Sequence, residues 1–267
     1  MGLNSSGQIS FGGSTSGQSI NLELGQSATA QISMNDSNVR TLAGVASGQI
    51  DLNTFHGKSN NPTPEYWWRA DSGLSTTGWT AYNGGVNFTF SNVSSANSTS
   101  GAYFNGSNSY GSASPGTTIS AKHIFARIDS LSVGGGAILG GSFYGIHEFM
   151  YSNGYYIVEG SGGGGYSYAA LAGTVGSKST WVDFANFSSP YYTLNNGSAN
   201  SLSVYAGSYT NRFWWPSGNI LLGIRQNSLY GDGGYMTGYV KEVAIFTTAL
   251  TQTQGQTFQS AMMARWP

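Results

Sequence analysis

The side chains best suited to ligand chemistry in this sequence are aromatic residues that occur as neighbours. Such pairs stand at Trp67 and Trp68, Tyr155 and Tyr156, Tyr191 and Tyr192, and Trp214 and Trp215. Neighbouring side chains on a β-strand point to opposite faces of the sheet, so one ring of each pair on a strand should face outward. An outward ring can stack on the apolar face of a sugar. We therefore predict glycan-binding candidates at Tyr155, Tyr156, Tyr191, Tyr192, Trp214 and Trp215. A ring that lies under a loop or in a subunit contact is the alternative, because exposed apolar patches also mark interfaces.

Side chains that could perform catalysis are sparse. The chain holds 11 carboxylates and three histidines, His56, His123 and His147, without the spacing of an acid/base pair or an activated nucleophile. His147 is followed by Glu148, but on a strand the two side chains would point to opposite faces and could not act together. We therefore predict no catalytic residue and a protein that is not an enzyme.

No residue pattern predicts a metal, cofactor or nucleotide site. Asp232, which stands between glycines, is a weak calcium candidate, but one carboxylate does not make a site and a solvated turn is the simpler interpretation. Asp71 and Asp183 have no better claim. The glycine-rich run at residues 132–136 lacks the Lys-Ser/Thr of a phosphate loop. We expect no cofactor, with calcium as the alternative.

The composition indicates many strands joined by turns. Gly supplies 40 residues, aromatic residues make up 14% and charged residues 8%, against roughly 25% charged residues in an ordinary domain. A net charge of −1 without any run of Lys or Arg argues against nucleic acid as a partner. We also expect no membrane insertion, because no apolar stretch approaches the roughly 20 residues of a span. The first residues lack the pattern of a secretory signal, so synthesis in the cytoplasm is expected.

Residues 1–62 differ from the rest of the chain because they contain neither Trp nor Tyr. Polar and apolar residues alternate at 8–11 and 19–24, which predicts short strands. Residues 35–44 carry the cap and spacing of a short helix. So small a set of large apolar groups should not fold alone, and we predict a β-rich attachment or oligomerisation segment that needs a partner. Prolines at 62 and 64 predict a stiff linker.

Residues 63–267 read as short strands separated by Gly, Ser and Asn turns, which is typical of a sandwich. The predicted strands are 86–90, 102–104, 123–128, 137–139, 145–151, 155–159, 180–184, 191–194, 202–206, 220–224 and 238–246. Asn153 and Gly154 predict a tight hairpin turn between two of them. One helix, capped by Thr251, should close the chain and pack on the sandwich.

Three sequence blocks resemble the laminin-G-like domains of the concanavalin-A-like class. They are Tyr66–Leu74, Gly101–Gly106 and Gly238–Phe246, and the resemblance spans most of the second domain. It implies an all-β, antiparallel jelly-roll sandwich, preceded by the N-terminal segment and followed by one short helix. The acid cluster of glycosidases on a related sandwich is missing, so a glycan-cleaving enzyme ranks last.

The N-terminal segment resembles a short module of tailed-phage tail, fibre and baseplate proteins. The matching blocks are Gln31–Asp36, Val39–Gly44, Ser47–Ile50 and Phe55–Lys58. This resemblance implies a virion component whose residues 1–62 bind other virion proteins or form a homo-oligomer. The sandwich would then bind host surface polysaccharide. A capsid decoration or neck protein with a purely architectural role is the alternative.

Overall fold

The computed structural model describes most of the chain. The described residues are 2–60, 63–130, 136–141, 148–152, 155–159, 166–169, 177–185, 191–201, 203–206, 213–215, 219–224 and 234–267. Side chains are described for all of these except residues 136, 148–152, 155–159, 166–169, 203–206 and 213–215. The chain forms two compact units. The first contains Met1–Thr63 and Thr251–Ala261, and the second contains Pro64–Leu250 and Met262–Pro267.

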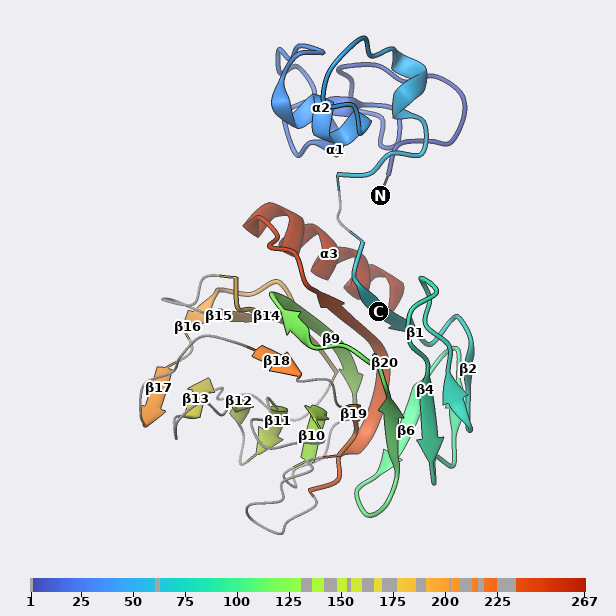
Figure 1. Ribbon diagram of the computed structural model, residues 1–267, viewed down its shortest axis with the longest axis vertical. Coiled ribbons are helices and arrows are strands. Elements are labelled where there is room, and N and C mark those ends of the chain that lie inside the picture. The colour runs from blue at the N-terminus through green and yellow to red at the C-terminus, as the bar shows by residue number, and fades with distance from the viewer. Residues whose placement is uncertain are drawn as a thin grey trace. The chain divides into compact units, whose positions relative to one another are not determined.

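The second unit is an antiparallel β-sandwich (Figure 1). One sheet has the order β16-β15-β14-β9-β20-β6-β5, with β1 also paired to β20. Its strands are β1 (Tyr66–Arg69), β5 (Ala96–Asn97), β6 (Gly101–Asn105), β9 (His123–Asp129), β14 (Lys178–Asp183), β15 (Tyr191–Leu194), β16 (Asn200–Ser201) and β20 (Thr237–Phe246). The other sheet has the order β17-β13-β12-β11-β10-β19-β7-β4-β3-β2.

The strands of this second sheet are β2 (Leu74–Ser75), β3 (Gly78–Trp79), β4 (Phe88–Ser91), β7 (Tyr110–Ala113), β10 (Gly136–Gly141), β11 (Glu148–Ser152), β12 (Tyr155–Glu159), β13 (Tyr166–Ala169), β17 (Ser203–Ala206) and β19 (Ile220–Leu222). A separate ribbon pairs β8 (Ile119–Ala121) with β18 (Phe213–Trp215). The all-β class and the sandwich predicted from the sequence are confirmed.

Every strand predicted between residues 86 and 246 overlaps a strand of the structure. The predicted hairpin is also present, because β11 pairs with β12 from Glu148 opposite Glu159 to Ser152 opposite Tyr155. The strands that sequence patterns missed are two to four residues long. One example is β7, Tyr-Gly-Ser-Ala, whose residues have weak strand propensity and depend on pairing with β4 and β19.

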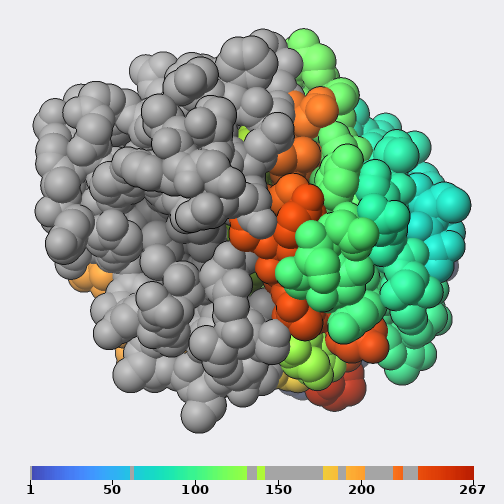
Figure 2. Space-filling model, turned by 90° about the horizontal axis from the view of Figure 1, so that it is seen from below, coloured from blue at the N-terminus to red at the C-terminus, as the bar shows by residue number. Residues whose placement is uncertain are grey.

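Large rings fill the core between the sheets. Trp68 lies 4.5 Å from Phe88, and Phe104 lies 6.0 Å from Phe90, measured between ring centroids. Residues distant in sequence meet here: the start of β20 lies beside β6, which Figure 2 shows as orange-red atoms against green ones. Gly101 permits this approach, since its φ is +91° and a Cβ atom would collide with the carbonyl oxygen of Val240.

The first unit is built from helical turns. It holds α1 (Ile20–Glu23), α2 (Ser37–Ala43), the 3₁₀-helix η1 (Leu52–Phe55) and the first part of α3 (Gln252–Arg265). Its apolar cluster comprises Leu3, Ile9, Ile20, Val39, Leu42, Ala43 and Phe55. The predicted helix at 35–44 is confirmed, and it ends at Gly44 in the left-handed conformation.

The prediction of a β-rich N-terminal segment is wrong. Within the described residues 2–60, extended pairing is limited to one bridge between Ser10 and Ser19. The alternating residues 19–24 instead form α1, because the side chain of Ser19 accepts a hydrogen bond from the backbone N–H of Leu22 and caps the helix. Local capping here outweighs a period-two pattern that is only a few residues long.

Candidate functional site

The alternation expected for neighbouring aromatic residues is seen at Trp67 and Trp68 on β1. Trp68 is fully buried in the sandwich core. Trp67 is half-buried on the other face of the sheet, where its ring lies 4.6 Å from the ring of Tyr82. Tyr82 is 45% exposed, the highest value for a large apolar or aromatic side chain in the described part of the molecule.

Arg69 completes this group of side chains. Its guanidinium carbon lies 4.1 Å from the centroid of the Tyr82 ring and 5.2 Å from that of Trp67. Its Nε and Nη2 atoms donate to the two carboxylate oxygens of Asp71, at 3.0 and 2.5 Å. The Tyr82 cluster, defined here as Trp67, Arg69, Asp71 and Tyr82, thus offers one exposed ring beside a hydrogen-bonding pair.

Glu242 on β20 fixes one member of the Tyr82 cluster, Trp67, by a hydrogen bond. Glu242 is fully buried, and its Oε1 atom accepts a hydrogen bond of 2.7 Å from the indole N–H of Trp67. Its Oε2 atom accepts from Arg265 and from the indole N–H of Trp266, both at 2.6 Å. A buried carboxylate with three donors holds its partners firmly, because losing one would leave charge unpaired. The last residues of α3 are therefore bound to the sandwich, whereas the residues of α3 up to Ala261 belong to the first unit.

Two of the predicted glycan-binding residues lie on β15. Tyr192 is 1% exposed, so it cannot stack on a ligand and is removed from the candidates. Tyr191 is half-buried, with its ring 5.4 Å from Trp181. Burial, with Asp183 beside it, raises the pKa of Tyr191. Asp183 also contacts His123 of β9. Tyr191 and Asp183 therefore take part in the packing of the sheet.

The other predicted site residues have no described side chains. Tyr155 and Tyr156 lie on β12, where they pair with Ser152 and Tyr151 of β11. Trp214 and Trp215 lie on β18, opposite Ser120 and Ile119. Asp232, the calcium candidate, and His147 lie outside the described residues. These four aromatic residues and Asp232 stay predictions.

His123 and Asp183 form a buried pair on neighbouring strands. His123 is fully buried, and its Nε2 atom accepts a 2.7 Å hydrogen bond from the backbone N–H of Leu250. Its Nδ1 atom lies 3.3 Å from Asp183 Oδ1 and 3.3 Å from the indole nitrogen of Trp181. Burial, reinforced by the positive charge of Lys122, lowers the pKa of His123 to about 4. Burial raises the pKa of Asp183. No substrate can reach His123, so this pair is structural.

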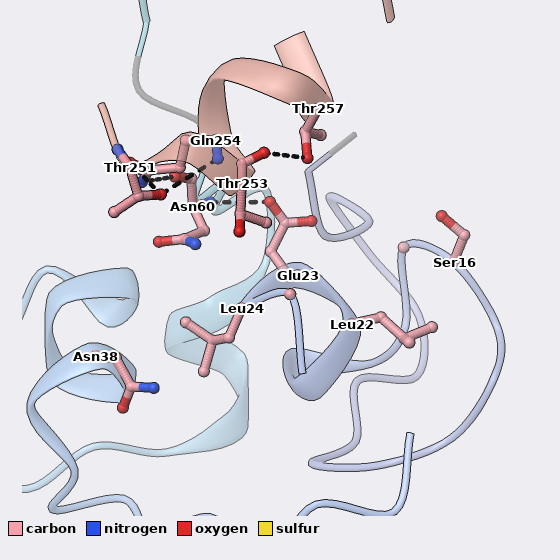
Figure 3. Close-up of a pocket in the computed structure, with 12 residues that line it drawn as sticks. Ser16, Leu22, Glu23, Leu24, Asn38, Asn60, Thr251, Thr253, Gln254 and Thr257 are labelled. Carbon is pink, nitrogen blue, oxygen red and sulfur yellow. Dashed lines mark hydrogen bonds between the residues drawn. The ribbon is translucent and has the colours of Figure 1, made fainter. Parts of the chain in front are cut away.

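The first unit contains a polar pocket of about 480 Å³ (Figure 3). Side chains of Glu23, Asn38, Asn60, Thr253, Gln254 and Thr257 line it, together with Leu22 and Leu24. In Figure 3, the side chain of Glu23 points toward the first turns of α3. Its Oε1 atom accepts hydrogen bonds from Ser59 Oγ at 3.0 Å and from the backbone N–H of Asn60 at 2.8 Å.

Sequence patterns indicated neither Tyr82 nor Glu23. Tyr82 stands directly before Asn-Gly-Gly, and an aromatic ring at a turn has no strand face to pack on. The sequence could therefore have indicated an exposed ring at Tyr82. Glu23 had no such signal, because its pocket is formed with residues of α3 at the other end of the chain.

The described side chains give no direct sign of a metal or a membrane span. No three His, Cys, Asp or Glu residues among them gather closely enough to hold a metal ion. None of the helices in the described ranges has the length and apolarity needed to cross a bilayer.

No family model matches this sequence, and no curated protein does. Solved structures do match. A Trypanosoma rangeli sialidase in complex with sialic acid has a TM-score of 0.54 at 12% identity, over 85% of this chain and 37% of its own. The same sialidase in complex with 2,3-difluorosialic acid has a TM-score of 0.53 at 12% identity, over 78% of this chain and 35% of its own.

A weaker match is the carbohydrate-binding module of a Ruminococcus gnavus IT-sialidase bound to α2,3-sialyllactose. Its TM-score is 0.36 at 10% identity, over 53% of this chain and 83% of its own, which is too low to carry an argument. The present chain spans little more than a third of the Trypanosoma rangeli sialidase chains. At this identity the likeness establishes a shared β-rich fold and not an activity.

The prediction that the protein is not an enzyme must be corrected. It depended on the lack of a recognisable acid/base pair or activated nucleophile in the sequence, yet the solved structures that share the fold belong to sialidases. The fold therefore does not exclude glycan hydrolysis.

Proposed function

We propose that the sandwich unit is a carbohydrate-binding domain whose ligand stacks on Tyr82. The observation that carries this proposal is the 45% exposure of the Tyr82 ring beside the half-buried Trp67 and Arg69, whose positions are fixed by hydrogen bonds. A large ring left in water costs free energy, and a flat sugar face covers it without a deep pocket. Structural likeness to sialidases supports the same ligand class.

The groups around Tyr82 supply polar contacts at the edge of such a ligand. Arg69 and Asp71 place donors and acceptors next to the ring, and their ion pair fixes their positions. The Glu242 network holds Trp67 behind them. A preorganised site loses little side-chain entropy on binding, which favours a weakly binding ligand class such as glycans.

Glycan-array screening of the full chain, followed by calorimetry on the best ligand, tests this proposal. Tyr82→Ala should weaken binding about tenfold, or ~1.4 kcal/mol, because it removes the stacking ring. Tyr82→Phe should stay near the wild-type affinity, because the ring remains. Leu52→Ala is the matched control, since it removes a side chain that is 38% exposed in the other unit. Wild-type affinity in Tyr82→Ala would exclude this site.

We further propose that residues 1–62 attach the chain to a phage particle, where the sandwich meets host surface polysaccharide. The resemblance of residues 31–58 to a tail, fibre and baseplate module supports this role, as does the separate apolar cluster of the first unit. Capsid decoration or a neck position is the alternative. Locating the chain in a purified particle by electron microscopy distinguishes them: a tail or baseplate position supports adhesion, and a capsid or neck position supports architecture.

A further inference from the structure

The pocket of the first unit has the size and lining of a small-molecule site that is separate from Tyr82. Its volume of about 480 Å³ falls within the roughly 300–1,000 Å³ of typical ligand pockets. Its residues come from the segment before α1, from α1 and the residues that follow it, from α2, from residue 60, and from the first turns of α3 (Figure 3). A ligand there would contact segments from both ends of the chain.

The charge of the lining selects against an anion. Glu23 is the only charged residue among the residues that line the pocket, and the rest of its polar groups are amides and hydroxyls. An anionic ligand would meet a like charge with no Lys or Arg to offset it. The pocket is equally unsuited to a divalent cation, because the described residues bring no second carboxylate to Glu23.

The carboxylate of Glu23 is oriented to receive hydrogen bonds from a ligand. Within the described part of the chain, the hydrogen bonds to it come from Ser59 and Asn60, and both end on Oε1. These bonds fix the carboxylate and leave Oε2 as an acceptor. Thr253, Thr257 and the amide of Asn38 lie around the same space, and hydroxyl groups and amides both donate and accept.

The hydrogen bonds around the first turn of α3 make this part of the pocket rigid. Thr251 Oγ1 accepts from the backbone N–H of Gln254, and Gln254 Oε1 accepts from the backbone N–H of Thr251, which is a capping box. The amide nitrogen of Gln254 also donates to the carbonyl oxygen of Asn60, at 2.9 Å. These bonds, several of which are drawn in Figure 3, hold the α3 side of the pocket to residue 60.

We propose that this pocket binds a neutral, hydroxyl-rich ligand of about disaccharide size. Sugar hydroxyls match the mixture of one carboxylate, several amides and several hydroxyls. Leu22 and Leu24 supply apolar surface for the C–H groups of the same ligand. The proposal does not depend on Tyr82, since the two sites share no residue.

Calorimetry on the full chain tests the pocket with lactose, maltose, cellobiose and chitobiose as neutral probes. Glucuronic acid serves as an anionic probe. At least one disaccharide should bind, with an affinity that does not change with ionic strength, because the ligand is uncharged. Glucuronic acid should not bind. If none of the four disaccharides binds at millimolar concentration, the proposal is wrong.

Two variants assign any binding to this pocket. Asn38→Trp should fill the space and lower affinity at least tenfold, whereas Asn53→Trp, on η1 and outside the pocket, should leave affinity unchanged. Glu23→Gln keeps the shape and the acceptor for Asn60, and should weaken binding about tenfold because a charged acceptor is lost. Binding that is lost in Tyr82→Ala but kept in Asn38→Trp would overturn this proposal and leave the Tyr82 site intact.

Discussion

At the scale of single residues, buried polar groups connect distant parts of the chain. Glu242 and His123 are both fully buried, yet each has hydrogen-bond partners that come from distant parts of the chain. Glu242 joins β1, β20 and the chain end, and His123 fixes the segment before α3. These residues explain why the end of the chain is part of the structure of the sandwich.

The stability of the sandwich should depend on pH through His123. Its pKa of about 4 lies below the ordinary value of 6.5, so the folded state resists protonation while the unfolded state accepts it. The stabilising effect is complete above pH 6.5 and is lost as the pH falls toward 4. Between pH 7 and pH 5 the loss should be about 2 kcal/mol.

Urea unfolding at pH 7 and pH 5, compared between the wild type and His123→Gln, measures this effect. Glutamine can still accept the hydrogen bond from Leu250 but does not titrate, so the variant should lose much less stability on acidification. Asp183 acts in the opposite sense, because its raised pKa favours protonation in the folded state. Because Asp183 contacts His123, the comparison measures the two residues as a pair. Equal losses in the two proteins would exclude His123 as the cause.

At the scale of elements, helix capping sets the boundaries in the first unit. Ser19 caps α1, Gly44 ends α2, and Thr251 with Gln254 caps α3. The same patterns were readable in the sequence at α2 and α3. At α1 a polar-apolar alternation hid the cap that Ser19 supplies.

Thr251→Ala should destabilise the first turn of α3 by about 1 kcal/mol, because it removes the side-chain oxygen that accepts from Gln254. Amide hydrogen exchange of residues 252–256 should then be about fivefold faster. Thr257→Ala is the matched control. Thr257 is exposed within the same helix and bonds only locally to the carbonyl oxygen of Thr253. Faster exchange in the control than in Thr251→Ala would contradict the capping role.

At the scale of the whole molecule, the two units differ in how much of the chain each needs. The first unit combines residues from both ends, and the second holds the large aromatic core. Residues 251–261 of the same chain belong to the first unit, and the partner chain expected for residues 1–62 stays a prediction.

Residues 63–267 produced alone should therefore melt cooperatively, because the sandwich core and the Glu242 network are retained. Residues 1–62 produced alone should not, because the segment from α3 is missing. Circular dichroism during heating measures both. Cooperative melting of the isolated residues 1–62 would show that the segment is self-sufficient.

The sequence by itself determined the class of fold, because strand length, alternation and turn residues are local properties. Local patterns predicted α2, the hairpin of β11 and β12, and the strands β4, β6, β9, β10, β14, β15, β17, β19 and β20. The sequence also shows Gly101, but it does not show why a glycine is needed there, which is the close approach of the Val240 backbone.

Only the tertiary structure decided which aromatic and acidic residues could serve a ligand. Tyr192 and Tyr82 are the same residue type, yet one is 1% exposed and the other 45%. That difference arises from strand pairing between distant segments, and a local pattern contains no information about it. The pocket at Glu23 has the same origin, since the residues that form it become neighbours only when the two ends of the chain fold together.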